Sequence, residues 1–368
     1  MTATAHINRI GTANPPHAVH AAFVDFVTNT IKDKRERRLF ERMVERSGIG
    51  QRFSYLQPVT LPDGTITDTE GFYGTGEWPG TARRMARYKT YAPELAVSAI
   101  HALDPGIAEA GITHLVVASC TGFVAPGVDQ LIVQRMGLDP GVERTVVGFM
   151  GCYAAVNSLR LAHHIVRSTP SARVLVVTVE LCSLHFQRSD NLQKLLSMLL
   201  FGDGAAAALV TADAEGIALT DFRAATIGAT ADAITWDIGD QGFDMHLGGE
   251  VPARIAEALR GEAASGASDG LLRGLRPSDF ELWAVHAGGR SILDAVENGL
   301  GLDGDALDGS RAVLNDCGNM SSATLMFVLA RLLRERGQSD APRSGLAMAF
   351  GPGLAAESFR FTLTGRDD

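Results

Sequence analysis

The chain has 368 residues, of which 46% are hydrophobic and 20% are charged, and its formal net charge at pH 7 is −9. This length fills two core units or one large layered fold, and the composition is that of a folded protein rather than a disordered one. The negative charge argues against nucleic acid as the principal partner, because phosphate contacts need a concentrated basic surface.

The sequence has no segment typical of a membrane span or a secretory signal. Residues 1–15 contain no apolar core of signal-peptide length, and no stretch reaches about 18 uninterrupted apolar residues. The four cysteines, at positions 120, 152, 182 and 317, lack C-x-x-C spacing, which favours reduced thiols over a metal site or a disulfide framework. We therefore expect a soluble, cytoplasmic protein with no membrane partner.

Residues 6–30 are expected to form a short apolar start, a turn around residues 14–16 and then a helix, and the most basic stretch, residues 32–52, follows them. Arg42 and Arg46 lie four apart, so a helix would place both guanidinium groups on one face, where they could hold the phosphates of a nucleotide-bearing substrate. The alternative is a solvated helix face with intrahelical ion pairs, because acids are interleaved. Residues 56–90, rich in Gly and Pro, are expected to form a long loop that covers another feature.

From about residue 91, helices and buried strands alternate, which predicts a layered α/β fold. Strands are expected at residues 115–122, 173–180 and 201–210, and a helix follows Pro126 and runs through Met136. Residues 261–270 have the composition of an exposed connection, after which the same order of elements returns.

This return predicts two related halves, residues 1–220 and 221–368. Residues 114–122 parallel 281–288, since each is an apolar strand that ends in a polar residue and a Gly turn. The repeat places Cys152 and Asn319 at matching helix starts, and Cys120 and His286 at matching strand ends. All four should meet at the pseudo-twofold centre, because α/β folds gather their chemistry at strand ends and helix N-termini.

Cys152 is the expected nucleophile. It lies in a small-residue turn directly before a helical run, where backbone N–H groups and the helix dipole favour a thiolate. The alternative is a buried core cysteine.

His286 and Asn319 complete a Cys/His/Asn set. A cysteine is only slightly ionised at pH 7, and a neighbouring imidazolium would help it to attack a thioester. His286 and Asn319 could also donate hydrogen bonds to a developing oxyanion. Separately, His286 could be a core histidine and Asn319 a helix cap.

Five motifs resemble those of the type III polyketide synthases, the chalcone synthase superfamily. They are Gly-Cys-Tyr-Ala-Ala at 151–155, Phe-Gly-Asp-Gly-Ala at 201–205, Val-His-Ala-Gly-Gly at 285–289, Gly-Asn-Met-Ser-Ser at 318–322 and Phe-Gly-Pro-Gly-Leu at 350–354. The similarity runs from Ile10 to the end of the chain. It implies a thiolase fold of two pseudo-symmetric βαβαβ-type halves in a layered α/β/α/β/α arrangement, a homodimer, and no metal or redox cofactor.

The resemblance also implies the chemistry. Cys152 would take a starter acyl group from coenzyme A, and His286 and Asn319 would bind malonyl-CoA and stabilise the enolate that forms when carbon dioxide leaves. That carbanion would attack the Cys152 thioester and lengthen the chain by two carbons, repeatedly, before cyclisation to an alkylpyrone, resorcinol or phloroglucinol-type product.

Other family positions carry over one at a time. Phe201 retains a gatekeeper aromatic, whereas the second gatekeeper falls at Met245, which predicts a wider or more pliable gate. Arg42 and Arg46 match two of three cationic coenzyme A contacts, and the third falls at Leu39. Four residues fall at wall positions of the elongation cavity and differ from those of plant chalcone synthases, namely Cys120, Thr121, Cys182 and His185. Cys120, Cys182 and Met245 favour an aliphatic starter, and Ser321, in the Gly-Asn-Met-Ser-Ser motif, is expected to contact the substrate.

Three rival functions remain open at this point. A ketoacyl-ACP synthase III uses the same three residue types but condenses once, with malonyl carried on acyl carrier protein, and would show a basic docking surface near its tunnel. A cysteine hydrolase would use Asn319 to orient the imidazole and would release free acid. A non-catalytic acyl-CoA binding protein would need no nucleophile.

Overall fold

The computed structural model describes residues 3–74, 76–228, 231–335 and 341–364. Its centre is one mixed nine-stranded sheet with the order β13-β14-β15-β10-β1-β9-β8-β6-β7. The bounds of these strands, in chain order, are β1 Ala5–Ala13, β6 His114–Ser119, β7 Glu143–Gly148, β8 Val174–Leu181, β9 Asp203–Thr211, β10 Ile217–Thr226, β13 Leu282–Val285, β14 Arg343–Gly351 and β15 Ala355–Leu363.

The two sides of this sheet repeat the same strand pairing. In the first side, β1 pairs antiparallel with β9, β9 antiparallel with β8, and β8 parallel with β6. In the second side, β10 pairs antiparallel with β15, β15 antiparallel with β14, and β14 parallel with β13. The sides join where Ala5–Ile7 pair with Ile217–Leu219. The internal repeat expected from the sequence is therefore present in the topology, within the described residues.

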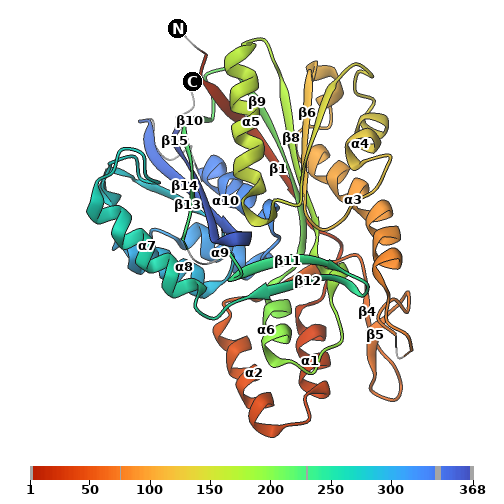
Figure 1. The fold of residues 1–368 in the computed structure, drawn as a ribbon. Helices are drawn as coiled ribbons and strands as arrows, with labels where there is room; N and C mark the ends of the chain where they lie inside the picture. Colours follow the sequence, from red (N-terminus) through yellow and green to blue (C-terminus); the bar gives the residue numbers. More distant parts are fainter. Residues whose placement is uncertain (1–2, 75, 229–230, 336–340, 365–368) are drawn as a thin grey trace.

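Helices cover both faces of each half-sheet and produce five layers (Figure 1). The central layer contains α5 (Ala154–Ser168) and α10 (Ser322–Glu335), whose apolar residues pack in one core with strands of both halves. The outer helices of the first half are α3 (Thr81–Leu103) and α4 (Val128–Met136). The outer helices of the second half are α7 (Val251–Ser265), α8 (Arg290–Leu300) and α9 (Asp308–Cys317). This is the layered α/β arrangement expected from the sequence.

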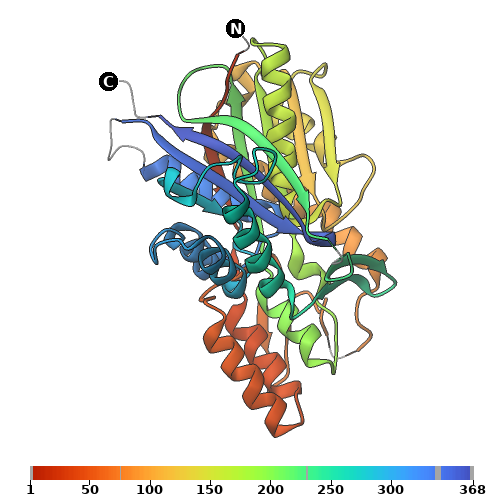
Figure 2. The same ribbon diagram turned by 60° about the vertical axis from the view of Figure 1, so that its left-hand side comes forward.

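A smaller group of elements lies at one end of the sheet. Helices α1 (His20–Thr30) and α2 (Lys34–Arg46) project from the body next to α6 (Leu192–Leu200), as Figure 2 shows. Val27, Ile31, Phe40, Leu195 and Leu199 form the small core between them. The hairpin of β11 (Ile234–Gly239) and β12 (Gly242–Leu247) crosses above α6 (Figure 1). This end of the molecule contains the cavity described below.

Two expectations for connecting segments are wrong in part. Residues 56–90 are not one loop, because β4 (Pro58–Thr60) pairs with β5 (Ile66–Asp68) and α3 begins at Thr81. Residues 261–270 are not wholly a connection, because α7 continues to Ser265 before Gly266 ends it with a φ of 60°. Both segments contain Gly and polar residues at helix ends and hairpin turns. These residues interrupt the spacing of apolar residues from which a helix or strand is predicted. Among the described residues, no helix is long and apolar enough to cross a bilayer.

Candidate active site

Cys152 lies in a short turn, Gly151–Tyr153, that leads directly into α5. The turn needs glycine before the cysteine, because Gly151 has a φ of 72° and a Cβ there would lie 2.5 Å from Cδ of Pro352. Pro352 and Gly351 belong to the second half of the chain, and Gly351 approaches the Cys152 backbone nitrogen. The cysteine is therefore held where the two halves meet, and its side chain is 9% exposed.

Asn319 occupies the matching position in the second half, three residues before α10 begins. Its Oδ1 accepts a hydrogen bond from the Ser321 backbone N–H at 2.8 Å, and its Nδ2 donates to the Gly288 carbonyl at 3.1 Å. These two bonds fix the amide and leave its second N–H to donate to the Cys152 sulfur. Ser321, at a φ of 48°, holds the strained conformation that this turn requires.

His286 directly follows β13, as Cys120 directly follows β6. His286 is 1% exposed, its backbone N–H donates to Met348, and both ring nitrogens lack a hydrogen-bond partner among the described residues. Because Asn319 bonds Gly288, two residues further along the chain, its amide and the imidazole share one edge of the sheet. A buried imidazole with unused nitrogens is suited to exchange a proton or donate to a bound oxyanion.

Burial dominates the electrostatics of this group. Burial raises the pKa of the Cys152 thiol to about 12, the Glu180 carboxylate adds to that rise, and hydrogen bonding from Ser321 and Asn319 opposes it. Burial also lowers the pKa of His286 to about 3. The direction for Cys152 is opposite to that expected from its helix N-terminus, because desolvation outweighs the dipole. The resting pair at pH 7 is therefore a thiol and a neutral imidazole, which is the form that can accept the thiol proton.

Glu180, at the end of β8, is a buried carboxylate without a cationic partner among the described residues. It accepts hydrogen bonds from the Cys120 backbone N–H at 3.0 Å, the Thr121 hydroxyl at 2.8 Å and the Ser322 hydroxyl at 2.5 Å. Burial raises its pKa. These bonds join the ends of β6 and β8 to the start of α10, so Glu180 holds the two halves in register beneath Cys152.

A largely apolar cavity lies beside this group, and all seven wall and gate positions expected from the sequence line it. They are Cys120, Thr121, Cys182, His185, Phe201, Met245 and Ser321. Cys152, His286 and Asn319 are not lining residues. The lining residue Ser321 connects the two, because its hydroxyl lies 3.1 Å from the Cys120 Sγ and also hydrogen-bonds the Cys152 thiol. The cavity therefore reaches the immediate neighbourhood of Cys152.

The far part of the cavity is formed by segments that are distant in sequence. Residues of α1 and of the β4–β5 hairpin line it, namely Val19, Ala22, Phe23, Phe26, Pro58, Ile66, Thr67 and Asp68. The expectation that residues 56–90 cover another feature is thus correct for the hairpin, which covers this cavity.

Trp236, which sequence reasoning missed, closes one wall of the cavity. Its indole N–H donates to the Cys120 carbonyl at 2.7 Å, although 116 residues separate the two. His185 is the second attachment of the same hairpin, because Nδ1 accepts from the Phe243 backbone N–H at 3.0 Å and Nε2 lies 2.7 Å from the Thr121 carbonyl. Met245 is therefore carried on a hairpin that is fixed to the catalytic side of the cavity.

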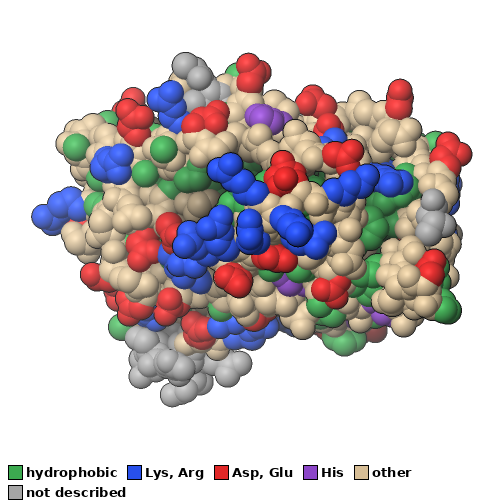
Figure 3. Space-filling model, turned by 90° about the horizontal axis from the view of Figure 1, so that it is seen from below, with side chains coloured by type: hydrophobic (Ala, Val, Ile, Leu, Met, Phe, Trp, Pro, Cys, Tyr) green, Lys and Arg blue, Asp and Glu red, His purple; other side chains and the backbone are tan. Residues whose placement is uncertain are grey.

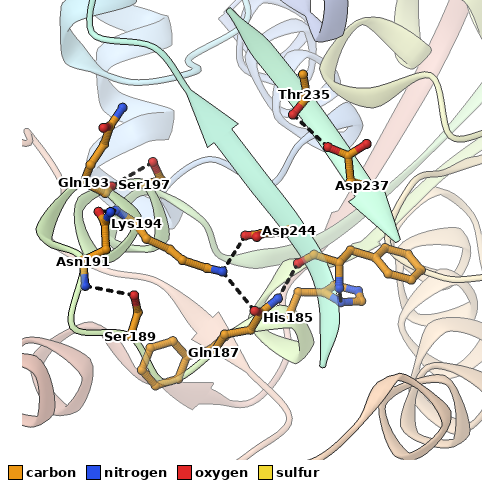
Figure 4. Close-up of polar contacts among 12 residues, drawn as sticks. His185, Gln187, Ser189, Asn191, Gln193, Lys194, Ser197, Thr235, Asp237 and Asp244 are labelled. Carbon is orange, nitrogen blue, oxygen red and sulfur yellow. Dashed lines mark hydrogen bonds and ion pairs between the residues drawn. The ribbon is translucent and has the colours of Figure 1, made fainter. Parts of the chain in front are cut away.

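The outer side of this hairpin has polar attachments (Figure 4). Lys194 lies between Asp244, at 2.8 Å, and Gln187, at 3.1 Å, and Gln187 donates to the Phe243 carbonyl at 3.0 Å. With both faces anchored, the position of Met245 is set by the fold rather than by a free loop.

Arg42 and Arg46 do not line the cavity. Both are exposed on α2, and neither has an ion pair to any described residue, so the alternative of intrahelical ion pairs is wrong for them. Leu39 lies three residues before Arg42 on the same face of α2, and its side chain is also exposed. Within the described part of the chain, no group of three or more His, Cys, Asp or Glu side chains is arranged to hold a metal ion.

Comparison with protein families identifies this arrangement. The model for the N-terminal domain of chalcone and stilbene synthases matches residues 2–214, and the model for their C-terminal domain matches residues 222–363. The chain belongs to the chalcone and stilbene synthase family. As a member of this family it is a type III polyketide synthase, an acyltransferase that performs decarboxylating condensations, and family members use acyl-CoA and malonyl-CoA.

Individual relatives span nearly the whole synthase. A bisdemethoxycurcumin synthase from Oryza sativa subsp. japonica is 35% identical, over 95% of this chain and 90% of the relative. The alpha-pyrone synthesis polyketide synthase-like Pks18 of Mycobacterium tuberculosis is 32% identical, over 99% and 93%. Among solved structures, PKS-I from the brown alga Ectocarpus siliculosus has a TM-score of 0.86 at 29% identity and covers 99% of both chains. The type III domain of Steely1 from Dictyostelium has a TM-score of 0.84 at 26% identity, over 98% of this chain and 99% of that domain.

Proposed function

We propose that this type III polyketide synthase loads an aliphatic acyl group from coenzyme A onto Cys152, extends it with malonyl-CoA more than once, and cyclises the product. The carrying observation is that the fixed Asn319 amide and the cavity-lining Ser321 hydroxyl both hydrogen-bond the Cys152 thiol. His286, whose ring nitrogens have no partner among the described residues, lies two residues before Gly288, which bonds the same amide. The same three residue types would serve a single condensation or a hydrolysis. The family match favours the iterative reaction over both.

Loading begins with a neutral thiol and a neutral imidazole. As the thioester approaches, the Cys152 proton passes to His286, and Sγ bonds to the acyl carbon. The carbon–sulfur bond to coenzyme A breaks, and the departing sulfur takes the proton from His286. Hydrogen bonding from Ser321 and Asn319 favours the transient thiolate, since both lower the thiol pKa.

In extension, Asn319 donates to the negative charge of an enolate oxygen, whereas in loading it donates to the Cys152 thiolate. When malonyl-CoA loses carbon dioxide, the electron pair of the broken bond moves onto the thioester oxygen as an enolate. Once the Cys152 sulfur is acylated and is a poor acceptor, the second N–H of Asn319 and an N–H of His286 donate to that oxygen. These donors cost little reorganisation, because Gly288 and Ser321 already hold the amide. The enolate carbon then attacks the acyl carbon on Cys152, and the Cys152 sulfur leaves.

An aliphatic starter suits the walls of the cavity. Most of its lining side chains are apolar, Phe is the commonest of them, and its far part runs between α1 and the β4–β5 hairpin. An alkyl chain gains about 0.8 kcal/mol for each methylene that it buries there. The likeness to a protein named for alpha-pyrone synthesis supports a pyrone as the product, with resorcinol and phloroglucinol types as the other ring closures.

Coenzyme A phosphates are proposed to bind Arg42 and Arg46, which present exposed, unpaired guanidinium groups one helical turn apart. The proposed reaction uses coenzyme A thioesters as substrates and calls for no metal or redox cofactor. A cytoplasmic location is proposed as well, supported by four free cysteines, one of which must remain a thiol to react.

A homodimer is supported by the free edge of β7. This strand ends the sheet, Val146 is 54% exposed, and Phe123 nearby is 48% exposed. An exposed strand edge with apolar side chains such as Val146 and Phe123 beside it can pair with a second copy about a twofold axis. Light scattering on the purified protein should give twice the chain mass, and Val146→Lys should reduce it toward the monomer.

The proposed function is tested by detecting the covalent acyl group on Cys152. Incubation with dodecanoyl-CoA should add one dodecanoyl group to the intact protein, and peptide mapping should locate it on Cys152. The starter proposal fails if aromatic acyl-CoA thioesters load at least as fast as aliphatic ones. The nucleophile assignment fails if Cys152→Ala still acquires the group.

A further inference from the structure

Four arginines form a row along the exposed face of α2. Arg35, Arg38, Arg42 and Arg46 follow one another at intervals of three or four residues, so their side chains share one face over roughly 16 Å of helix axis. Figure 3 shows Lys and Arg side chains gathered on the face of the molecule from which α1, α2 and α6 project. We call these four residues the α2 arginine row.

The α2 arginine row lacks close ion pairs within the described part of the chain, although Arg35 and Arg38 lie near enough to Asp33 to lower the pKa of its carboxyl group. None of its guanidinium groups forms an ion pair or side-chain hydrogen bond with a described residue, although Glu36, Glu41 and Glu45 lie on the same helix. Some other arginines of the chain are paired, as Arg311 is with Asp294 at 2.8 Å and Arg360 with Asp221 at 3.0 Å, whereas Arg135 and Arg260 also have no ion pair to a described residue. An unpaired cationic row on a chain whose net charge is −9 offers a local site for an anionic partner.

Two large apolar side chains accompany the row. Leu39 and Met43 are 40% and 41% exposed, and they lie one and two helical turns from Arg35 on its side of the helix. Most other large apolar residues of α1, α2 and α6 are inside their shared core. Arginines beside exposed Leu and Met have the composition of a protein-docking surface. Apolar side chains do not bind a phosphate group, but they can be buried against a protein partner.

The row leads to the catalytic edge. After α2 ends, the backbone N–H groups of Gly50 and Gln51 bond to Asn315, and Gly48 lies against the side chain of Arg290. Arg290 begins α8 directly after the segment from His286 to Gly289. Arg46 is thus at the catalytic end of the row and Arg35 at the distant end.

Coenzyme A accounts for only part of this surface. Its phosphates are proposed to use Arg42 and Arg46, which leaves Arg35, Arg38, Leu39 and Met43 without a role. A thioester can also arrive on the phosphopantetheine arm of a carrier protein, whose remaining surface then needs a docking site beside the entrance. A partner that is acidic and carries apolar residues in its docking helix matches both the charge and the apolar pair.

We propose that the α2 arginine row, with Leu39 and Met43, docks an acidic acyl carrier protein that delivers its acyl thioester to Cys152. This inference rests on the proposed loading of Cys152. The transfer is an exchange of thioesters: the Cys152 sulfur bonds to the acyl carbon, the bond to the pantetheine sulfur breaks, and the thiol proton ends on the pantetheine sulfur. No oxidant, metal or further substrate is consumed.

The experiment compares two donors of one acyl group. Dodecanoyl-loaded fatty-acid acyl carrier protein and dodecanoyl-CoA are each supplied to the full-length synthase, and the rate of acyl transfer to Cys152 is followed by intact mass. The test variant is Arg35→Glu with Arg38→Glu, which reverses the distant half of the row. The control, Arg135→Glu with Arg260→Glu, changes the net charge equally on exposed positions of α4 and α7.

The proposal predicts that reversal of Arg35 and Arg38 raises the KM for the acyl carrier protein by roughly tenfold or more, and leaves the KM for dodecanoyl-CoA within about twofold. The control variant should use both donors as the wild type does. The inference is overturned if the acyl carrier protein fails to load Cys152, if both donors weaken equally, or if the variant instead loses binding to phosphatidylglycerol vesicles with carrier-dependent loading unchanged. Failure of dodecanoyl-CoA itself to load wild-type Cys152 would count against the proposed function.

Discussion

Phe201 and Asn319 are joined by their backbones in an isolated parallel β-bridge. Asn319 N–H donates to the Leu200 carbonyl at 2.8 Å, and Gly202 N–H donates to the Asn319 carbonyl at 3.0 Å. Phe201, which lines the cavity, is therefore joined to the backbone of the residue whose side-chain amide is proposed to hold the enolate. Arg52 braces the bridge from behind, since its guanidinium donates to the carbonyls of Met198 and Phe201 at 3.0 and 2.8 Å. A substitution that displaces this bridge should therefore change both the cavity wall at Phe201 and the position of the Asn319 amide.

Gly318→Ala should damage this bridge. Gly318 has a φ of 69°, and a Cβ there would lie 2.7 Å from Cγ of Arg52 and 2.9 Å from the Leu200 carbonyl. We expect a loss of roughly 2–3 kcal/mol in the free energy of unfolding, measured with urea, together with loss of malonyl-CoA decarboxylation. Gly301→Ala is the matched control, because Gly301 has a φ of 63° with open space around it and should lose only about 1 kcal/mol. Equal effects of the two substitutions would contradict the proposed clash.

Asn319→Ala should slow decarboxylation by roughly 100-fold or more, because it removes a preorganised donor to the enolate oxygen. Conversion of malonyl-CoA to acetyl-CoA measures this step without a starter. Loading of Cys152 by acyl-CoA should fall much less, which separates the enolate role from general misfolding. A decarboxylation rate near that of the wild type would refute the role.

The reactivity of Cys152 should depend on Ser321. Its hydroxyl lowers the pKa of the buried thiol, so Ser321→Ala should raise that pKa and reduce the thiolate fraction at any pH below it. We expect alkylation of Cys152 by iodoacetamide at pH 8 to slow several-fold, and the pH profile of alkylation to shift upward. An unchanged profile would mean that the hydroxyl does not act on the thiolate.

Sequence reasoning anticipated the parts of the site that depend on local pattern. Cys120 and His286 each end a short apolar run, and the structure places them at the ends of β6 and β13, which occupy equivalent places in the two half-sheets. Cys152 and Asn319 each follow a glycine with positive φ, before α5 and α10. Such positions can be predicted because a strand end or a glycine turn is recognisable from a few neighbouring residues.

Features of the site that depend on contacts between distant parts of the chain could not be predicted from the sequence. Trp236 lies in a polar, Gly-containing stretch, and its role comes from a bond to Cys120 across 116 residues. The pKa direction of Cys152 also could not be read, because it follows from burial between two halves rather than from the local helix. The alternation of Trp236 with polar neighbours in a strand pattern was the available signal that it faces inward.

Trp236→Ala should enlarge the cavity and lengthen the products. The indole lines the wall that Met245 also lines, so its removal opens space next to the growing chain. We expect longer starters or additional extensions in the product masses, and a loss of roughly 3 kcal/mol in stability. Trp236→Phe serves as the control, because it keeps most of the volume and removes only the bond to the Cys120 carbonyl. An unchanged product distribution in Trp236→Ala would show that another residue limits chain length.

Asp203 should make stability depend on pH. Burial raises its pKa to about 7, although Ser183 donates to it through the backbone N–H at 2.7 Å and the hydroxyl at 2.6 Å. The unfolded state, with a pKa near its usual value, then binds fewer protons, so this residue lowers stability as pH rises from about 4 to 7 and adds nothing further above 7. Relative to Asp203→Asn, the wild type should lose about 2 kcal/mol between pH 5 and pH 7 in urea unfolding. Parallel curves for the two proteins would contradict the raised pKa.

The most direct test of the account is the mass of the products made from a fatty acyl-CoA and carbon-labelled malonyl-CoA. Iterative synthesis on Cys152 predicts wild-type products that are heavier than the starter by several labelled two-carbon units, and no such products from Cys152→Ala. A single labelled unit, free acid alone, or extended products from Cys152→Ala would contradict it.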